Sequence, residues 1–457
     1  MKEEELVMWR SRKRVCRIAL NVCLLGLSLL LLAGLQVSAA SGKQVVLHQI
    51  TSTGAHGRMM SYIVELFEEK TGIKVELEPL PNDPRRTKIV NDLVSGAGQN
   101  DLVLMDGKSW GDVIWPYLVD LEPFMNRDKY NPYEDLIKPV VDVGRFGPKQ
   151  HLFALPYRYS GWIIYYRKDL FSKHGVQLPK TWEDYYQAAK KLTIDSNGDG
   201  KPEIYGTAIS GKQGVYSMND IESWITGHGG GIFAPDYSRV TITDKPAIKA
   251  IERWLGVYRN GWTPPGSNTY VDESRITAMQ QGRIAFWSCW GIYPQLMLDP
   301  KQSRVYDKVD LALIPSPDDS SERYIPISGW SMGISKYSKH KDEAWEFIKF
   351  ITSPDIQQKV AVMKDFGNGP VRLSTYKDPQ VKESIPRSDV MLESLLSGKA
   401  RPGYVGYFAD VEETVSAGLS GALVKNTKAS EVAATIAKGL QSILKNKIQP
   451  TLESQGK

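Results

Sequence analysis

Residues 155–193 read LPYRYSGWIIYYRKDLFSKHGVQLPKTWEDYYQAAKKLT and predict one α/β unit. The segment 162–166 is continuously apolar or aromatic, which is typical of a buried strand. Thr181 then precedes an acidic first turn with Glu183 and Asp184, and an apolar stripe follows at helical spacing. This order predicts a capped amphipathic helix, so the stretch combines a strand, a short loop and a helix.

Strands and helices alternate along much of the remaining chain. Residues 73–78 alternate apolar and polar side chains, and residues 102–105 form a short apolar strand bounded by Asp101 and Asp106. A helical segment at 87–95 lies between them. Strands that alternate with helices favour a mainly parallel sheet, in which ligands bind at the carboxyl ends of the strands. Asp106 occupies such an end.

Length and charge limit the class of protein. A chain of 457 residues is too long for one ordinary hydrophobic core, which predicts two lobes. Residues 1–40 hold six Lys or Arg and three Glu, so the formal charge of +5 becomes +2 for the remaining 51 basic and 49 acidic residues. Nucleic acid is not expected as a partner, because a nearly neutral chain lacks the basic stripe that phosphate neutralisation requires.

The first 40 residues have the pattern of a secretory signal peptide. Five basic residues between positions 10 and 17 precede an apolar run over 18–37, and the small residues Ser-Ala-Ala follow at 38–40. A run of about 20 residues is also long enough to span a bilayer, so an uncleaved N-terminal anchor is the alternative. Both interpretations place the remainder outside the cytoplasm. Cys289 is then its single cysteine, and an internal disulfide is excluded.

Several motifs resemble those of extracellular solute-binding proteins of ABC importers, in particular the carbohydrate-binding, maltose-binding-protein-like family 1. The resemblance covers nearly all of the chain after the leader and is most specific over 155–193 and 340–372. The motifs are FEEKTGIKVELEPLP (67–81), YRKDLF followed by PKTWE (166–183), GRIAFWSCWG (282–291) and KHKDEAWEFIKFITSPDIQQ (339–358).

The resemblance implies an α/β, two-lobe periplasmic-binding-protein fold with discontinuous lobes joined by a three-segment hinge. The implied crossings lie near 155–160, 282–290 and 330–335. The expected domains are a signal peptide or anchor at 1–40, an N-terminal lobe made of 42–155 and 283–333, and a C-terminal lobe made of 156–282 and 334–457.

The resemblance also implies a function. The protein is expected to be the extracytoplasmic substrate-binding component of an ABC transporter, which captures a sugar or oligosaccharide between its lobes by hinge closure and delivers it to a membrane permease. The expected partners are a carbohydrate ligand and the ABC permease subunits. The receptor is expected to be exported, periplasmic or associated with the cell surface, monomeric, and not an enzyme.

A sugar-binding cleft needs aromatic rings and hydrogen-bonding groups. The apolar C–H face of a pyranose stacks on Trp or Tyr, whereas its hydroxyls bind Asp, Asn, Arg and backbone groups. The alternative for each Trp is a role as a core aromatic. Ligand contacts are expected from Asp106, Tyr157, Ser160, Trp224, Trp287, Trp290, Trp330 and Arg372.

Two other functions stay open. The sequence has no H-x-x-H or H-E-x-x-H spacing and no G-x-S-x-G elbow. A secreted carbohydrate-active hydrolase is nevertheless the second hypothesis, since it also uses carboxylates and Trp. The third hypothesis keeps the receptor fold with a polyol or sugar-phosphate cargo, for which Arg372, Arg158 and Lys108 could serve an anionic group.

Residues 195–203 match the first half of an EF-hand loop. Oxygen-bearing side chains fall at loop positions 1, 3, 5 and 9, and the required glycine at position 6 is Gly200. Position 12 is Gly206 in place of the bidentate Glu. The alternative is an Asx-rich turn without metal, and no cofactor is required for function. The pattern indicates a structural Ca²⁺ held by Asp195, Asn197, Asp199, the carbonyl of Lys201 and Glu203.

Overall fold

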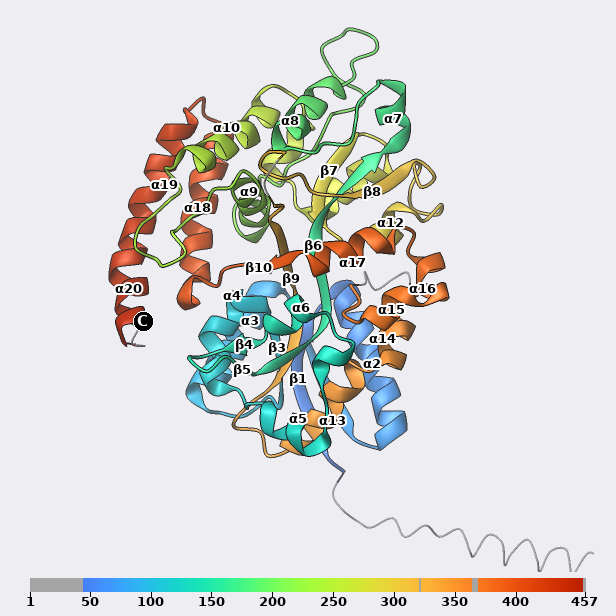
Figure 1. Ribbon diagram of the computed structural model, residues 1–457, viewed down its shortest axis with the longest axis vertical. Coiled ribbons are helices and arrows are strands. Elements are labelled where there is room, and N and C mark those ends of the chain that lie inside the picture. Colours follow the sequence, from blue (N-terminus) through green and yellow to red (C-terminus); the bar gives the residue numbers. More distant parts are fainter. Residues whose placement is uncertain (1–43, 320–321, 364–368, 455–457) are drawn as a thin grey trace, which may run out of the picture. The chain divides into compact units, whose positions relative to one another are not determined.

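The computed structural model describes residues 44–319, 322–363 and 369–454 (Figure 1). The expected leader at residues 1–40 lies outside these ranges. Val46–Lys457 form one compact unit. Across the described ranges, no helix is long and apolar enough to cross a membrane.

A mixed sheet runs through this unit in the order β2-β1-β3-β9-β6-β7, with β8 beside β6 and β10 beside β9. β1 is parallel to β2 and β3, whereas β9 is antiparallel to both β3 and β6. A separate hairpin pairs β4 with β5. The strands are β1 (Val46–Ser52), β2 (Lys74–Leu80), β3 (Leu102–Asp106), β4 (Arg145–Phe146), β5 (His151–Leu152), β6 (Ala154–Arg167), β7 (Phe286–Trp290), β8 (Val309–Leu313), β9 (Ile325–Ile334) and β10 (Gly398–Ala400).

The first lobe packs helices against β1, β2 and β3. In α2, Met59, Ile63 and Phe67 recur every four residues and are buried, as an amphipathic helix requires. Phe67 meets Phe347 of α13 with ring centroids 5.0 Å apart. The helices of this lobe are α2 (Gly54–Thr71), α3 (Asn82–Ser95), α4 (Gly107–Ile114), α5 (Glu122–Asp128), α6 (Lys138–Asp142), α13 (Lys341–Ile351), α14 (Pro354–Ala361), α15 (Leu373–Lys377) and α16 (Pro379–Ser384), with α17 (Ser388–Leu396) packed along β6.

The second lobe surrounds β7, β8 and the end of β6. Its core holds Trp182, Trp224 and Trp254, all of which are buried. In Figure 1, α18 and α19 lie side by side next to α9 and α10. The helices are α7 (Lys168–Lys173), α8 (Trp182–Lys191), α9 (Val215–Gly227), α10 (Lys245–Arg259), α11 (Asp272–Gln280), α12 (Pro294–Met297), α18 (Phe408–Leu423), α19 (Ala429–Ile443) and α20 (Gln449–Ser454).

The strand and capped helix predicted for 155–193 are both present. β6 includes the apolar segment 162–166, and α8 begins directly after Thr181. Thr181 Oγ1 accepts the N–H of Asp184 at 3.1 Å, while the Asp184 carboxylate accepts the N–H of Thr181 at 2.9 Å. These reciprocal bonds form a capping box, which satisfies two amide groups that the helix itself leaves unpaired.

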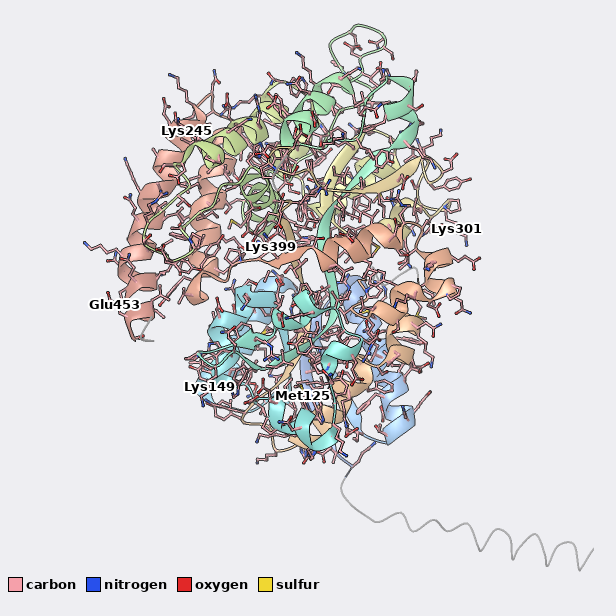
Figure 2. All side chains as sticks on the ribbon, viewed as in Figure 1. Met125, Lys149, Lys245, Lys301, Lys399 and Glu453 are labelled. Carbon is pink, nitrogen blue, oxygen red and sulfur yellow. The ribbon has the colours of Figure 1, made fainter. Side chains whose placement is uncertain are left out.

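Three connections join the lobes. In β6, residues 154–161 pair with β9, whereas 162–167 pair with β7 and β8. β9 leads back to the first lobe, where its residues 330–334 pair with β3. The third connection follows α17 through β10 to α18, and Figure 2 marks Lys399 within it.

The expected lobe boundaries are wrong for two segments. β7 and β8 lie within 283–333, yet they pair with the second half of β6, and Phe286 is part of the second lobe's core. α13 lies within 334–457, yet it packs against α2 in the first lobe. The crossing expected near 282–290 is likewise inside the second lobe. A strand's own sequence does not reveal which neighbour it pairs with.

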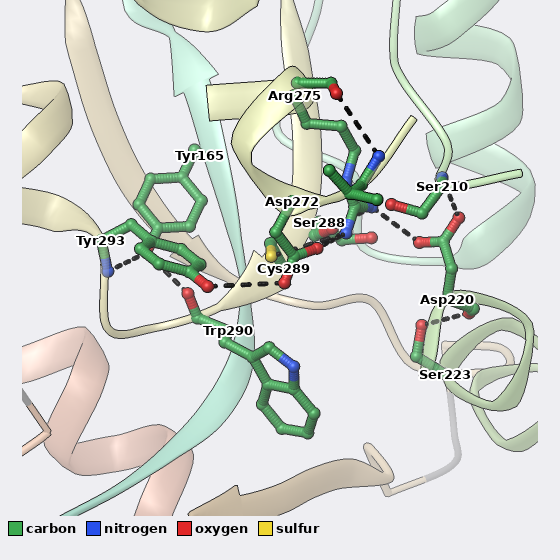
Figure 3. A network of polar contacts seen from close by, with 12 residues as sticks. Tyr165, Ser210, Asp220, Ser223, Asp272, Arg275, Ser288, Cys289, Trp290 and Tyr293 are labelled. Carbon is green, nitrogen blue, oxygen red and sulfur yellow. Dashed lines mark hydrogen bonds and ion pairs between the residues drawn. The ribbon is translucent and has the colours of Figure 1, made fainter. Parts of the chain in front are cut away.

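Arg275 of α11 lies at the centre of a buried polar network in the second lobe (Figure 3). Its guanidinium binds Asp220 at 2.9 Å and Asp272 at 2.5 Å, and all three side chains are buried. Trp254 Nε1 and the amide N–H of Ser210 also donate to Asp220. Burial acts to lower the pKa of Arg275, but Asp220 and Asp272 outweigh it and raise this pKa, so the cation persists.

The same network fixes the loop that follows β7. The Tyr293 hydroxyl donates to Asp272 at 3.4 Å. The Tyr165 hydroxyl donates to the carbonyl of Trp290 at 2.8 Å and accepts the N–H of Tyr293 at 3.2 Å. The backbone of Trp290 is therefore anchored to the buried ion pairs (Figure 3).

Replacing Arg275 with Met should lower the free energy of unfolding by about 3–5 kcal/mol, because it leaves a buried Asp220 carboxylate without its cation. Denaturant titration measures this loss. Arg304→Gln, at an exposed arginine, is the control and should change stability by less than about 0.5 kcal/mol. Adding Asp220→Leu to Arg275→Met should recover part of the loss. An Arg275→Met variant as stable as the control would show that the buried ion pairs do not contribute to stability.

Candidate ligand-binding site

A row of side chains crosses the sheet where the two lobes meet. Trp330 of β9 is paired with Asp106 of β3 on one side and with Arg158 of β6 on the other. Residues paired across antiparallel strands project from the same face and lie within reach of each other. Asp106, Trp330 and Arg158 are all half-buried, so this face is partly open.

The row continues into the second lobe. Ser328 is paired with Ser160, and Trp162 of β6 is paired with Trp290 of β7. Side chains two residues apart on a strand share a face, which places these residues on the face of Arg158. The rings of Trp162 and Trp290 meet edge to face with centroids 4.7 Å apart. We call this set the cross-strand row: Asp106, Ser328, Trp330, Arg158, Ser160, Trp162 and Trp290.

Helices of the first lobe surround Trp330. His56, in the first turn of α2, stacks on Trp330 with centroids 5.3 Å apart, and Trp110 of α4 meets it edge to face at 5.7 Å. The Arg85 guanidinium of α3 lies over the Trp330 ring, 4.8 Å from its centroid. Arg85 is held in place because it donates to Ser52 Oγ at 2.5 Å and to an amide oxygen of α3.

His56 and Tyr157 form a buried hydrogen-bonded pair beside this ring. His56 Nε2 and the Tyr157 hydroxyl are 2.7 Å apart. Burial, with Arg158 and Arg85 nearby, holds the pKa of His56 well below its usual 6.5. Burial also raises the pKa of Tyr157 well above 10, against the opposing effect of the same two arginines. The imidazole is therefore neutral and the phenol protonated near pH 7.

Arg401 brings a cation from the third connection. Its Nε donates to Glu222 of α9 at 2.6 Å, and the Tyr404 hydroxyl donates to the same carboxylate at 3.1 Å. The Arg401 guanidinium also lies 5.8 Å from the ring centroid of Trp290. Burial opposes the charge of Arg401, but Glu222 and then Asp106 raise its pKa. Arg401 thus interacts with one carboxylate from each lobe.

Burial raises the pKa of Asp106 above its usual 3.8. Arg401, a hydrogen bond donated by Ser328 Oγ at 3.0 Å, and Arg85 each oppose this shift but do not overcome it. The carboxylate is consequently a strong hydrogen-bond acceptor whose charge is only partly stabilised by the protein itself.

A cavity of about 820 Å³ opens between the lobes. α3 and α4 line one side, and the start of α9 and α18 line the other, with Trp110 shared between the cavity and the surroundings of Trp330. Its polar lining includes Arg86, Lys212 and Glu412. A larger cavity of about 980 Å³ lies around Tyr205 and Trp262 in the second lobe, away from the row. The inter-lobe cavity adjoins residues of both lobes and reaches the surroundings of Trp330 through Trp110, although the residues of the cross-strand row do not line it.

The structure brings five of the eight expected ligand contacts to this region and separates three from it. Asp106, Ser160, Trp290 and Trp330 belong to the cross-strand row, and Tyr157 lies beside it. Whether they contact a ligand stays a prediction.

The other three expected residues have structural partners elsewhere. Trp224 is 1% exposed and packs 5.0 Å from Trp182 in the second lobe's core. Trp287 is fully buried, stacked on Tyr165 at 5.4 Å, on the opposite face of β7 from Trp290. These two tryptophans serve as core aromatics.

Arg372 is buried within the first lobe. It donates to Asp135 at 2.9 Å and to the carbonyl of Thr352. Its charge therefore joins two segments of that lobe.

Sequence reasoning missed several residues at this site, namely His56, Arg85, Glu222 and Arg401. His56 follows the carboxyl end of β1, where a ligand is expected in a parallel sheet. Its position in the sequence could therefore have identified it as a candidate site residue. Arg401 and Glu222 are 179 residues apart in sequence, and only the tertiary fold reveals their pairing.

The loop at 195–203 uses its oxygens to bind its own backbone. Asp195 accepts the N–H groups of Gly198 and Gly200 at 2.7 and 2.8 Å, and Glu203 accepts the N–H of Ser196 at 2.8 Å. Gly206, at position 12, lies against a backbone carbonyl and supplies no ligand. These bonds form the Asx-rich turn, while the oxygen donors are those that Ca²⁺ prefers.

The carboxylates of this loop are not drawn together around one point. In the described part of the chain, three metal-ligating side chains come within 4.8 Å of one another at Asp120, Glu122 and His151 in the first lobe. The donor set at 195–203 fits Ca²⁺ in type, and binding would require these oxygens to converge. Calcium binding by this loop stays a prediction.

Asp106→Asn should raise the free energy of unfolding at pH 7 by about 1 kcal/mol, because the amide keeps the oxygen that Ser328 binds and removes a partly desolvated charge. The raised pKa of Asp106 means that the charged form is disfavoured in the folded state. The gain in unfolding free energy should therefore be full at pH 7. It should shrink as the pH falls through this raised pKa towards 3.8, the ordinary pKa of Asp. Urea titrations at pH 7 and pH 4 test this, and a less stable Asn variant at pH 7 would contradict it.

Comparison with known proteins identifies the family. The model of the bacterial extracellular solute-binding protein family matches residues 52–358. A probable ABC transporter-binding protein of Deinococcus radiodurans is 25% identical over 86% of this chain and 93% of its own length. A mannitol-binding protein of Pseudomonas aeruginosa is 25% identical over 74% of this chain and 76% of its own length.

The solved structures agree with this assignment. The maltose-bound MalE3 protein of T. maritima superimposes with a TM-score of 0.75 at 25% identity, covering 87% of this chain and 100% of that one. The expected two-lobe periplasmic-binding-protein fold is thereby confirmed. The chain belongs to the bacterial extracellular solute-binding proteins.

Proposed function

We propose that this protein is the extracytoplasmic substrate-binding component of an ABC importer and that it captures a sugar or polyol between its lobes. The observation that carries the proposal is the cross-strand row, which presents hydrogen-bonding and aromatic side chains from both lobes on one face. The mannitol-binding and maltose-bound relatives support a cargo of this chemical class.

The side chains of the row suit a hydroxylated ligand. The aromatic surfaces of Trp330 and Trp290 can contact the C–H face of a sugar or the carbon chain of a polyol. The Asp106 carboxylate accepts hydrogen bonds from hydroxyl groups, and Arg158 and Arg401 donate them. A ligand bound here would exchange water contacts for fixed partners in both lobes.

Hinge closure follows from contacts to two lobes at once. A ligand that binds residues of both lobes better in the closed form shifts the population towards that form. The three connections described above, β6, β9 and the segment after β10, are the hinge segments in this proposal. The closed receptor would act as an exported monomer that delivers its cargo to the ABC permease subunits without chemical change.

The purified protein should show a saturable rise in melting temperature with a mono- or oligosaccharide or a polyol, because a ligand that binds only the folded state stabilises it by mass action. A thermal-shift screen that includes maltose and mannitol measures this, and chromatography of the ligand checks for turnover. Small-angle scattering should show compaction with the same ligand. Product formation would instead support the hydrolase hypothesis.

Replacing Trp290 with Ala should weaken the affinity for that ligand by about tenfold or more, since it removes one aromatic surface of the site. Titration calorimetry measures the affinity. Trp262→Ala is the matched control, because Trp262 is also partly buried in the second lobe but packs on Tyr186 away from the row. Equal affinities of the wild type and both variants would remove Trp290 from the site.

Calcium is proposed as a structural ion of the 195–203 loop. Adding CaCl₂ to chelator-treated protein should raise the melting temperature, and Asp199→Ala should abolish the rise by removing one oxygen ligand. Asp236→Ala is the matched control, because Asp236 caps an exposed Asx turn through Ser238 outside the loop. An identical melting temperature with and without calcium would leave the loop as a turn only.

A further inference from the structure

We propose that Asp120, Glu122 and His151 form a zinc-binding site in the first lobe. The bound ion joins the start of α5 to the β4–β5 hairpin. The inference goes beyond the proposed function, because the site takes a metal ion and none of its three residues belongs to the cross-strand row that would hold the cargo.

One ring nitrogen and two carboxylate oxygens converge at this place. One ligand atom from each of the three residues lies within 4.8 Å of the other two. His151 Nδ1 contacts Asp120 Oδ2 and lies 4.0 Å from Glu122 Oε2. Zinc binds imidazole nitrogen together with carboxylate oxygen, whereas calcium and magnesium prefer oxygen ligands alone. The donor set therefore favours zinc over these two ions.

Main-chain hydrogen bonds bring these donors together from separate segments. Asp120 and Glu122 flank Leu121, whose N–H donates to the carbonyl of Leu152 at 2.9 Å. Leu152 directly follows His151 in β5, and β5 is in turn paired with β4. The approach of the three side chains is therefore set by the backbone and does not depend on their attraction for one another.

Each carboxylate has one oxygen held by the protein and a second oxygen near His151. Asp120 Oδ1 accepts the N–H of Glu122 at 2.9 Å, and Glu122 Oε1 accepts a hydrogen bond from Arg145 at 3.0 Å. The second oxygens, Oδ2 and Oε2, are the ones that approach His151 Nδ1. Carboxylates that bind a metal are usually held by such outer partners, which orient the ligating oxygen.

Arg145 is a cation beside the site and acts against a metal ion. Its charge is shared with another carboxylate, because Arg145 Nε lies 3.7 Å from Asp142 Oδ1, and the same nitrogen donates to the Tyr133 hydroxyl at 2.8 Å. The charges of Asp120 and Glu122 by themselves balance the two positive charges of zinc. The site therefore does not depend on removing Arg145.

The three side chains are open to solvent and can adjust to an ion. The exposed fraction is 35% for His151 and 31% for each of the two carboxylate side chains. Tetrahedral zinc has bonds of about 2.0–2.1 Å, which separates its ligand atoms by roughly 3.3 Å. Rotation of these half-exposed side chains provides that spacing. Three protein ligands leave the fourth position of the ion to water.

Zinc takes the place of the hydrogen bond between His151 Nδ1 and Asp120. A neutral imidazole carries one proton, which either ring nitrogen can hold. When zinc binds Nδ1, the proton resides on Nε2, so the ring stays neutral and does not repel the ion.

Calorimetric titration of the chelator-treated, untagged protein with ZnCl₂ tests this site. A single zinc ion should bind saturably and raise the melting temperature, because a ligand of the folded state stabilises it by mass action. An excess of CaCl₂, which would fill the 195–203 loop, should not compete. Co²⁺ in place of zinc should show the visible absorption of a tetrahedral ion, which reports on coordination independently of stability.

His151→Ala should weaken zinc binding by about 100-fold or more, since a lost ligand costs at least as much as a lost outer partner. Glu122→Gln should also weaken it and is an independent variant, because the amide keeps the oxygen that accepts from Arg145. His48→Ala is the matched control, since His48 is exposed and lies 3.6 Å from a single carboxylate, that of Glu76. Circular dichroism and melting temperatures without metal check the folds.

Three results would overturn the inference: no saturable zinc binding by the wild type, wild-type affinity in His151→Ala, or an equal loss of affinity in the His48→Ala control. Titration with the sugar or polyol ligand should give the same affinity with and without zinc. Failure of the zinc site is therefore distinguishable from failure of the proposed function.

Discussion

The pairing of β9 with two neighbours is the constraint on which the site depends. Asp106, Trp330 and Arg158 share a face only because β9 is antiparallel to both β3 and β6 in this register. A slip of one residue would turn Trp330 to the opposite face. Gly329 opposes such a slip, since a Cβ added there would lie 2.1 Å from the carbonyl oxygen of Arg158. Close backbone approach next to Trp330 therefore fixes the register that assembles both lobes' contributions.

The two clusters of buried charge in this protein differ in how completely they are paired. Arg275 has a carboxylate on each side, and its network is enclosed within one lobe. Such pairing fixes structure, because the ions satisfy each other. In the cross-strand row the pKa of Asp106 is raised, and beside the row the buried Nδ1 of His56 has no hydrogen-bond partner among the described residues. Perturbed groups with incomplete partners beside a cavity are typical of binding sites.

Local sequence patterns predicted where helices and strands form, but they did not predict which helices and strands pack against each other. The capping box at Thr181 and the apolar strand at 102–105 depend on residues that are close in sequence, so the sequence predicted both. Trp287 and Trp290 differ by three positions in one strand and thus face opposite sides, but assigning the outward face requires knowing what β7 packs against. The lobe boundaries failed for the same reason, since β7, β8 and α13 take their place from contacts with distant segments.

The third connection joins the charges of the site to the geometry of the hinge. Tyr404 and Val405 have positive φ angles of 52° and 55°, which are unfavourable for residues with a side chain, and Val405 is β-branched. The Tyr404 hydroxyl donates to Glu222, which also binds Arg401. Gly403 packs so closely against α4 of the first lobe that a Cβ there would lie 2.3 Å from the carbonyl oxygen of Lys108. A ligand that binds Arg401 would therefore contact a strained segment that touches both lobes. Ligand binding could in this way change the conformation of the third connection.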